Sequence, residues 1–388
     1  MPTKRVTGIT ATICGAVLLY ATAAASIAEA RDLRFAIGFP EGSDTHRAAE
    51  IYADKMEAYS EGHVSATIYP LTLLNFQEMS GGIQAGIADI GQVLTAYFVS
   101  EYPHYNMIGE SALLLNLIEA DDVTGRMAYV GAMSEFAFHH CPECHDEFAA
   151  QNQVFTGSAA GGIYELSCDE PVRSLDEIEG KRLRAPGSHW ARWSNELGAT
   201  PVSMSANEVF EALNQGVVDC VVISAPELTN LGLIDAVTDI TTDVPGGTFA
   251  GTAIANVNAD VWADLGETER ESMLRASAEM AAEGLFMYFE QEKEIMADAR
   301  EADDIAVHEP DDELLERTLE FSQQDMETIT SYYAEERGVE RSEEMLEVFE
   351  ALLETWVERV EDVDSAEELG QLYWEHAFSE VDVNQHGE

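Results

Sequence analysis

Apolar and polar residues alternate near the start of the chain in a pattern that predicts a strand, a helix and a second strand. The apolar run Leu33–Phe39 predicts the first strand. Ser43 or Asp44 can cap the helix that follows it. Apolar residues then recur at helical spacing: Ala48, Tyr52, Met56 and Tyr59. Gly62 ends this helix, and Val64–Tyr69 alternates as the next strand. The pattern predicts the α/β class, a sheet covered by helices.

Two distant stretches repeat one pattern. IQAGIADIGQV begins at Ile83, and LNQGVVDCVVI begins at Leu213. Each holds the end of a helix, a glycine, two apolar residues, an aspartate and a strand. Ser205 and Glu208 form a capping box at the start of the second helix. One explanation is that such patterns are common in α/β proteins. The other is that the chain has two similar lobes, each of which provides one wall of a cleft.

The second half of the chain changes from strands to acidic helices. Strands are predicted at GGIYELSC (161–168) and KRLRA (181–185). After Gly266 the pattern predicts one long helix, followed by two amphipathic helices at Leu314–Glu336 and Glu343–Glu361. A last capping box, which begins at Ser365, predicts a short final helix.

Residues 1–30 are interpreted as a cleaved signal peptide. A short basic start precedes an apolar stretch at 9–25, and 28–30 form a small-x-small cleavage site. An uncleaved membrane anchor is the alternative. No later segment has the roughly 18 consecutive apolar residues that a membrane helix needs. We therefore expect a mature protein that is soluble, lies in the periplasm and does not insert into the membrane.

The chain is strongly acidic, with 73 acidic against 20 basic residues and a formal net charge of −53. Phosphate contacts need a basic face, so nucleic acid is not an expected partner. Self-repulsion opposes compaction unless salt screens it, and the Debye length falls to about 3 Å at 1 M salt. The composition therefore predicts a halophilic protein that works in strong brine.

CPECH (141–145) has the C-x-x-C-H spacing of a covalent haem attachment site. His139 and His140 could add ligands for zinc or copper. Ligands so close in sequence rarely converge on one metal, and an even number of cysteines in an exported chain favours disulfides. We predict a local disulfide between Cys141 and Cys144, with a periplasmic metal or redox protein as the alternative function.

The other two cysteines of the predicted mature chain lie on predicted strands. Cys168 and Cys220 can pair with each other or remain core thiols. The sequence leaves both possibilities open.

Arg182 and Arg184 lie on the same side of a short predicted strand, with Leu183 opposite. Trp190 and Trp193 follow at the start of a helix. An arginine at a strand end beside a helix N-terminus offers a bidentate fork and nearby N–H groups to a carboxylate. The alternative is a surface arginine paired with a glutamate. Since no nucleophile elbow, phosphate loop or H-E-x-x-H motif is present, we expect no enzyme, no metal site and no cofactor.

These residues resemble the solute-binding subunits of tripartite ATP-independent periplasmic (TRAP) transporters, of the C4-dicarboxylate-binding type. SLDEIEGKRLRAPGS (174–188) is similar to that family's strand and turn. LGATPVSMSANEVFEALNQGVVDC (197–220) is similar to a longer and more specific family block. The resemblance implies two α/β lobes, a long helix that spans both, closure on a small carboxylate ligand, and docking on TRAP membrane permease subunits.

With this organisation, we expect a first lobe at 31–155 with a returning segment at about 244–265. The second lobe is expected at 156–243. The spanning helix and the C-terminal helices are expected at 266–388.

The resemblance places the family's carboxylate-binding arginine at Arg184. A second arginine, found in sialic-acid-type members, falls near Tyr164, whose phenol donates one hydrogen bond but carries no charge. An asparagine of many members falls on Ile223, so Ser224 is the nearest polar substitute. The expected ligand-binding residues are Phe39, Tyr97, Tyr164, Arg184, Trp190, Ser224 and Phe249, with Trp193 as a further candidate for an aromatic wall. A zwitterionic compatible solute such as ectoine is the alternative ligand, since it too presents a carboxylate.

Overall fold

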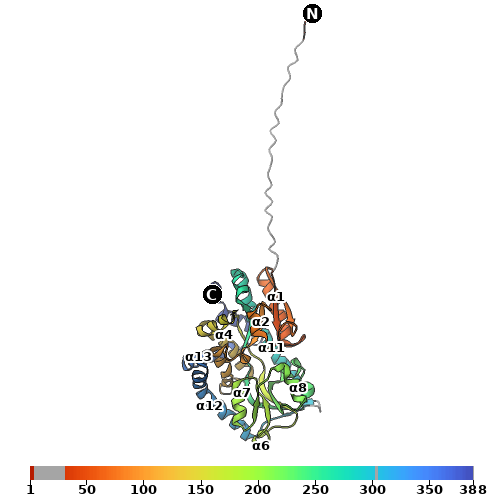
Figure 1. The fold of residues 1–388 in the computed structure, drawn as a ribbon, viewed down its shortest axis with the longest axis vertical. Helices are drawn as coiled ribbons and strands as arrows, with labels where there is room; N and C mark the ends of the chain where they lie inside the picture. The colour runs from red at the N-terminus through yellow and green to blue at the C-terminus, as the bar shows by residue number, and fades with distance from the viewer. Residues whose placement is uncertain (4–30, 302–304, 388) are drawn as a thin grey trace.

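The computed structural model describes residues 1–3, 31–301 and 305–387. The predicted signal peptide lies almost wholly outside these residues. Figure 1 shows an elongated body in which α1 (Asp44–Tyr59) and α2 (Met79–Gln84) lie toward one end. Helices α6 (Leu175–Ile178) and α8 (Val209–Asn214) lie toward the other end. Each half is built around its own sheet.

The sheet of the first lobe has the strand order β2-β1-β3-β11-β4, with β5 also paired to β11. Strand β1 runs parallel to both β2 and β3, whereas β11 is antiparallel to β3. The strands are β1 (Arg31–Ile37), β2 (Val64–Pro70), β3 (Ile90–Leu94), β4 (Gln153–Val154), β5 (Ser158–Ala159) and β11 (Thr252–Asn258). The predicted strand–helix–strand unit is therefore present as β1-α1-β2.

The sheet of the second lobe has the order β12-β10-β6-β9-β7-β8. Its strands are β6 (Ile163–Cys168), β7 (Arg182–Arg184), β8 (Thr200–Val202), β9 (Cys220–Ser224), β10 (Asp239–Thr248) and β12 (Ala306–His308). Helices α7 (Ser188–Glu196) and α9 (Ala225–Asn230) follow β7 and β9. Among the described strands, the chain changes sheets between Ala159 and Ile163, between Thr248 and Thr252, and between Asn258 and Ala306. The lobe boundaries given above remain predictions.

Local sequence signals account for many of the helix ends. The Ser43 side chain accepts a hydrogen bond from the backbone N–H of His46 and caps α1. The predicted capping box of Ser205 and Glu208 is present in full. Along α1, Ala48, Tyr52 and Met56 are buried, as their spacing predicts.

Helix α11 (Glu267–Glu301) contacts α1 of the first lobe and both α9 and β12 of the second. It is therefore the spanning helix that the family resemblance implies. Three more helices follow: α12 (Asp312–Arg337), α13 (Ser342–Val360) and α14 (Ala366–Tyr373).

A run of helices between β3 and β4, two strands of the first sheet, was not predicted. It contains α3 (Pro103–Glu110), α4 (Asp122–His139) and α5 (Pro142–Ala150). CPECH thus lies in a helical region rather than in the expected α/β pattern.

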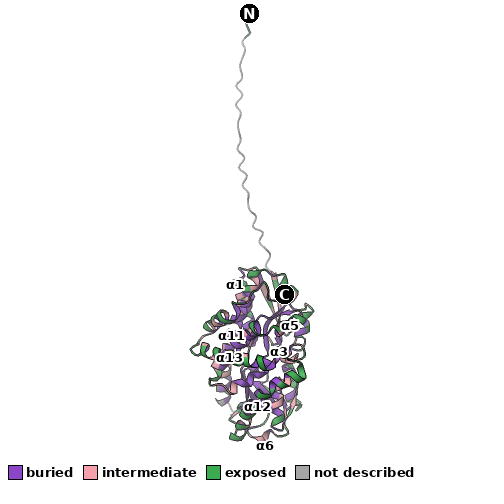
Figure 2. Cartoon of the chain, turned by 90° about the vertical axis from the view of Figure 1, so that its left-hand side faces the viewer, coloured by how far each residue is buried: buried purple, intermediate pink, exposed green. Residues whose placement is uncertain are grey.

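Buried residues fill the interior of both lobes, and exposed residues face outward from the helices (Figure 2). The larger of two apolar clusters contains residues from both sheets and from α11. Within the described part of the chain, no helix combines the length and apolar character needed to cross a bilayer.

Candidate ligand-binding site

A cavity of about 70 Å³ lies between the two lobes and α11. The first lobe contributes Phe39, which follows β1, and Tyr97, which follows β3. The second lobe contributes Arg184 at the end of β7 and Phe249 after β10. Ligands of α/β proteins bind beyond the carboxyl ends of parallel strands, and the ends of β1, β3 and β7 meet here.

Arg184 is the main charged group in this cavity. Its side chain is 1% exposed, while Leu183 on the opposite side of β7 packs into the core. The guanidinium donates to the Tyr97 hydroxyl at 3.0 Å and makes longer bonds, of 3.4–3.5 Å, to the carbonyl oxygens of Met204 and Val222. No salt bridge to Arg184 is formed among the described residues. A buried cation without a counter-charge is costly, so this site favours an anion.

Arg182, two residues earlier, has a different role. Its guanidinium and backbone N–H both bind the Asp219 carboxylate, and its Nη1 donates to the Gly216 carbonyl oxygen at 2.7 Å. The side chain is 43% exposed. The alternative of a surface arginine paired with an acid therefore describes Arg182, not Arg184.

Two aromatic groups border the cavity. On the second lobe, the Tyr164 ring stacks on Trp190 with centroids 4.2 Å apart and planes 12° apart, and Phe249 lies 6.3 Å from Tyr164. On the first lobe, Phe39 packs edge-on against Phe76 at 4.9 Å. These rings offer flat apolar walls to a compact ligand.

Of the seven predicted ligand-binding residues, Trp190 and Ser224 do not line the cavity, whereas the other five do. Ile223, which stands where the resemblance places an asparagine of other members, also lines it. Trp190 lies behind Tyr164 and donates from its indole N–H to the Gly246 carbonyl oxygen at 3.1 Å. Ser224 packs against Gly162. The ligand-binding roles of the predicted residues remain predictions.

Trp193, the further aromatic candidate, is also absent from the cavity wall. Its indole N–H donates to the Thr318 hydroxyl at 3.1 Å, so it joins α7 to α12.

Glu227 is the cavity residue that the sequence analysis missed. It lies in the first turn of α9, where an acidic residue is an ordinary feature, and nothing local indicates that it is buried. Its side chain is 6% exposed, and Oε1 accepts a 2.6 Å hydrogen bond from the Tyr288 hydroxyl of α11. Burial raises the pKa of Glu227 to about 7; the hydrogen bond from Tyr288 opposes this shift, the Asp44 charge adds to it, and the Arg184 charge opposes it.

The two lobes touch each other across the cavity. Tyr97 Oη accepts from the backbone N–H of Ala206 at 3.0 Å, and the Asn207 side chain donates to the Gly38 carbonyl oxygen at 3.2 Å. The backbone N–H of Asp44 donates to Asn230 Oδ1 at 3.1 Å. These bonds describe a closed arrangement of the lobes.

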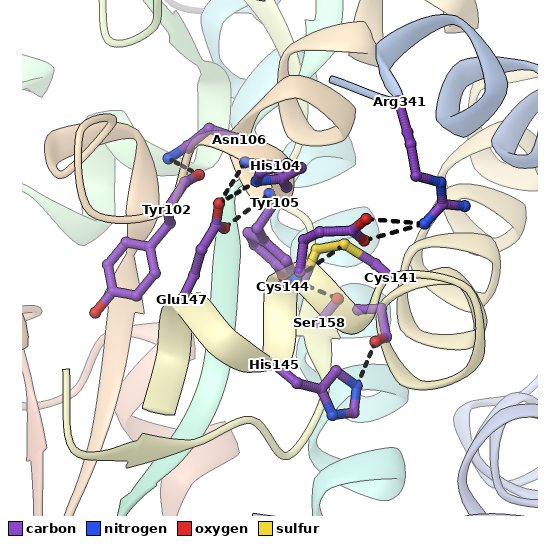
Figure 3. Close-up of a disulfide and its surroundings, with 12 residues drawn as sticks. Tyr102, His104, Tyr105, Asn106, Cys141, Cys144, His145, Glu147, Ser158 and Arg341 are labelled. Atoms are coloured by element: carbon purple, nitrogen blue, oxygen red, sulfur yellow. Dashed lines mark hydrogen bonds and ion pairs between the residues drawn. A yellow bond between two sulfur atoms is a disulfide. The ribbon is translucent and has the colours of Figure 1, made fainter. Parts of the chain in front are cut away.

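CPECH forms a disulfide rather than a haem or metal site (Figure 3). Cys141 and Cys144 are bonded to each other and buried, so neither sulfur is free to bind a haem vinyl group or a metal. The imidazole N–H groups of His145 and His139 donate to the carbonyl oxygens of Ala137 and Ala377, each at 2.7 Å. No three metal-ligating side chains converge anywhere in the part of the chain that the structure describes.

Cys168 and Cys220 form the second disulfide, between the neighbouring strands β6 and β9. The predicted disulfide at Cys141 and Cys144 is therefore confirmed, and the open question about the other pair is decided in favour of pairing.

Comparison with known proteins agrees with this geometry. Residues 35–334 match the family model of bacterial extracellular solute-binding proteins, family 7. The chain belongs to this family. Its members include the solute-binding proteins of TRAP transporters, so the resemblance drawn from the sequence is confirmed at the level of the family.

Relatives and solved structures with this fold differ in what they bind. The outer membrane transporter protein TsaT of Comamonas testosteroni is 22% identical over 74% of this chain and 82% of its own. The sialic acid-binding periplasmic protein SiaP of Vibrio cholerae is 23% identical over 52% of this chain and 60% of its own. The ectoine-binding protein of the Halomonas elongata TeaABC transporter superimposes with a TM-score of 0.70 at 18% identity, over 84% of this chain and 99% of its own. A pyroglutamate-specific TRAP protein from a marine metagenome gives 0.68 at 17% identity, over 83% and 99%.

Proposed function

We propose that this solute-binding protein works in the periplasm, where it captures a small organic acid between its lobes and delivers it to the membrane permease of a TRAP transporter. The observation that carries the proposal is Arg184, a buried guanidinium without an anionic partner among the described residues. A ligand carboxylate would accept its N–H groups as a bidentate, charge-assisted pair. The closed lobes exclude water, which strengthens such a pair.

The charge of the cavity supports a single carboxylate at this position. Among the described residues that line it, Arg184 is the only basic side chain, and Glu227 is acidic. The second carboxylate of a C4-dicarboxylate would meet no second cation. We therefore propose a monocarboxylate, bound with its apolar part between the aromatic walls of Phe39 and Tyr164.

A zwitterionic solute such as ectoine is the second candidate. It also presents one carboxylate to Arg184, and the fold is similar to that of the ectoine-binding protein of Halomonas elongata. The acidic composition supports a protein that functions in brine, where such solutes accumulate.

Titration calorimetry of Arg184→Met with L-pyroglutamate and cyclohexanecarboxylate tests the proposal. We expect the affinity of every carboxylate that binds the wild type to fall at least tenfold, because a hydrogen bond to a charged group contributes about 1.5–3 kcal/mol. Arg317→Met, at a partly exposed position of α12 outside the cavity, is the control and should bind within about twofold of the wild type. Unchanged affinity in Arg184→Met would remove the assigned role.

A further inference from the structure

The cavity contains acceptor oxygens that no group in the described part of the chain uses. Glu227 Oε2 is buried and has no hydrogen-bond partner among the described residues, although Oε1 of the same carboxyl is held by Tyr288. Gln92 also lines the cavity, and its buried side-chain oxygen likewise has no partner in the part of the chain that the structure describes. Unsatisfied buried acceptors are unusual in folded proteins and call for an explanation.

Glu227 is fixed in its position. The carboxyl lies on α9, directly after β9, and the Tyr288 hydroxyl reaches it from α11 at 2.6 Å. Burial, and then Glu227 itself, keep the pKa of Tyr288 well above its ordinary value, so this phenol remains a donor. Oε1 is therefore occupied, and Oε2 has no hydrogen-bond partner among the described residues.

Glu227 and Arg184 present opposite kinds of chemical group to the same cavity. Both line it, and both are more than nine-tenths buried. No salt bridge joins them directly. Arg184 offers donors and a positive charge, while Glu227 offers an acceptor that can become negative.

We propose that Glu227 is a specificity-determining residue that binds a cationic N–H group of the ligand, so that the solute is a compact zwitterion with one carboxylate and one protonated nitrogen. This inference rests on the proposed function, because it takes Arg184 as the carboxylate partner. An N–H donor of the ligand satisfies Glu227 Oε2, and a second one can reach the Gln92 oxygen.

The proton balance of binding follows from the groups that face Glu227. These groups are Tyr288 of α11, Asp44 of α1, Arg184 of β7 and Tyr164 of β6. Because burial raises the pKa of this carboxyl to about 7, both its protonated and its ionised form are accessible in the empty protein near neutral pH. The raised pKa stabilises the empty folded protein at low pH, and this contribution is lost as the pH rises through 7. A cationic ligand favours the ionised carboxylate, so binding releases a proton.

Two isosteric ligands test the inference. L-pipecolate and cyclohexanecarboxylate share a six-membered ring and a carboxylate, but only the first has a ring ammonium group. We expect the wild type to bind L-pipecolate at least tenfold more tightly. Its affinity should rise about tenfold between pH 6 and pH 8, with net proton release in calorimetry in buffers of different ionisation enthalpy. Binding of cyclohexanecarboxylate should release no proton.

Glu227→Gln is the matched variant, because it keeps the size of the side chain and loses the charge. We expect the ratio of the two affinities to fall to near one and the proton release to disappear. Glu290→Gln, on an exposed part of α11, is the control and should keep the wild-type ratio.

The outcomes separate the two proposals. Proton uptake, equal affinities in the wild type, or an unchanged ratio in Glu227→Gln would overturn the inference and leave the carboxylate site in place. No measurable binding of L-pipecolate when cyclohexanecarboxylate binds would also overturn it. If neither ligand depends on Arg184, the proposed function itself is wrong.

Discussion

The two lobes contain the same four-stranded unit in two versions. In the first lobe the order is β2-β1-β3-β11, and in the second it is β8-β7-β9-β6. In both, the second strand runs parallel to its two neighbours and the fourth strand is antiparallel. The repeated sequence pattern therefore reflects two similar lobes and is more than a chance recurrence of a common α/β pattern.

The similarity extends to single hydrogen bonds. Arg34 of β1 binds the Asp89 carboxylate through its backbone N–H and its guanidinium, which also donates to the Gly86 carbonyl oxygen. Arg182 of β7 makes the same set of bonds to Asp219 and Gly216. Both glycines have left-handed backbones, with φ of 69° and 61°, which explains why a glycine ends each helix.

The lobes differ where the ligand site begins. Two residues after the paired arginine, the first lobe has Ala36 and the second has Arg184, at equivalent register positions. Ala36 is fully buried in the core, whereas Arg184 reaches the cavity. The same strand position is thus occupied by a core residue in the first lobe and by a candidate binding residue in the second.

Among these predictions, an arginine introduced at the equivalent position of the first lobe should cause the largest loss of stability. We expect Ala36→Arg to lower the free energy of unfolding by about 3–5 kcal/mol, because a guanidinium at this fully buried position would be an uncompensated charge. Ala36→Met, which adds bulk without charge, should cost only about 1–3 kcal/mol. Urea denaturation in a high-salt buffer measures both. Equal stability of the two variants would show that the charge is tolerated and that the two positions are closer in character than the structure indicates.

A second difference lies between the third and fourth strands of each unit. In the second lobe Cys168 and Cys220 are cross-strand partners and form a disulfide, whereas the first lobe has Val257 opposite Ile90 at the equivalent place. We expect Cys168→Ala/Cys220→Val to lose about 2–4 kcal/mol, because the bond closes a loop of 52 residues in the unfolded chain. Ile90→Val should cost only about 0.5–1.5 kcal/mol.

Urea denaturation without reductant measures this contrast. Adding reductant should lower the stability of the wild type more than that of the double variant, in which only the Cys141–Cys144 disulfide remains to be reduced. If the double variant were as stable as the wild type, an apolar pair at this position would stabilise the fold as much as the disulfide does.

Elements with a one-sided apolar pattern or a clear cap could be predicted from the sequence. Helix α1 and the capping box at Ser205 are examples, because local residues define them. Helix α4 was missed because it is buried on nearly all faces, so it has no polar face from which a period can be read. CPECH was correctly read as a disulfide, but the helices around it were not foreseen.

In the candidate site, too, only the residues with a local sequence signal could be predicted. Arg184 was found because it lies in a block that resembles a family motif. Glu227 was missed because its burial depends on Tyr288, 61 residues further along the chain. Ser224 was proposed as the polar group of β9, yet it is Ile223 that faces the cavity. Which side of a strand end meets a cavity depends on the other lobe and on α11, and local periodicity does not contain that information.

The smallest expected effects concern the paired aspartates, where the lobes are most alike. Hydrogen bonds from Arg182 lower the pKa of Asp219; for Asp89, burial acts to raise the pKa, but the bonds from Arg34 outweigh it. Both carboxylates therefore stabilise the fold above their unfolded pKa, and this contribution is lost as the pH falls through the lowered folded pKa. Asp89→Asn and Asp219→Asn should each cost about 0.5–1 kcal/mol at pH 7, since the arginines are partly exposed, and this cost should shrink as the pH falls through the lowered folded pKa of each carboxyl.

Ligand affinity should separate these two otherwise similar variants. Asp219 holds β7, the strand that carries Arg184, so its loss should weaken carboxylate binding by about two- to fivefold. Asp89 holds β1, which carries no charged cavity group, so Asp89→Asn should bind within about twofold of the wild type, like the exposed control Asp54→Asn. Calorimetry with cyclohexanecarboxylate at pH 7 makes the comparison. Equal losses of affinity in both aspartate variants would mean that the affinity follows overall stability. A loss confined to Asp219→Asn would show that the repeated ion pair supports binding only in the second lobe, where its strand also carries Arg184.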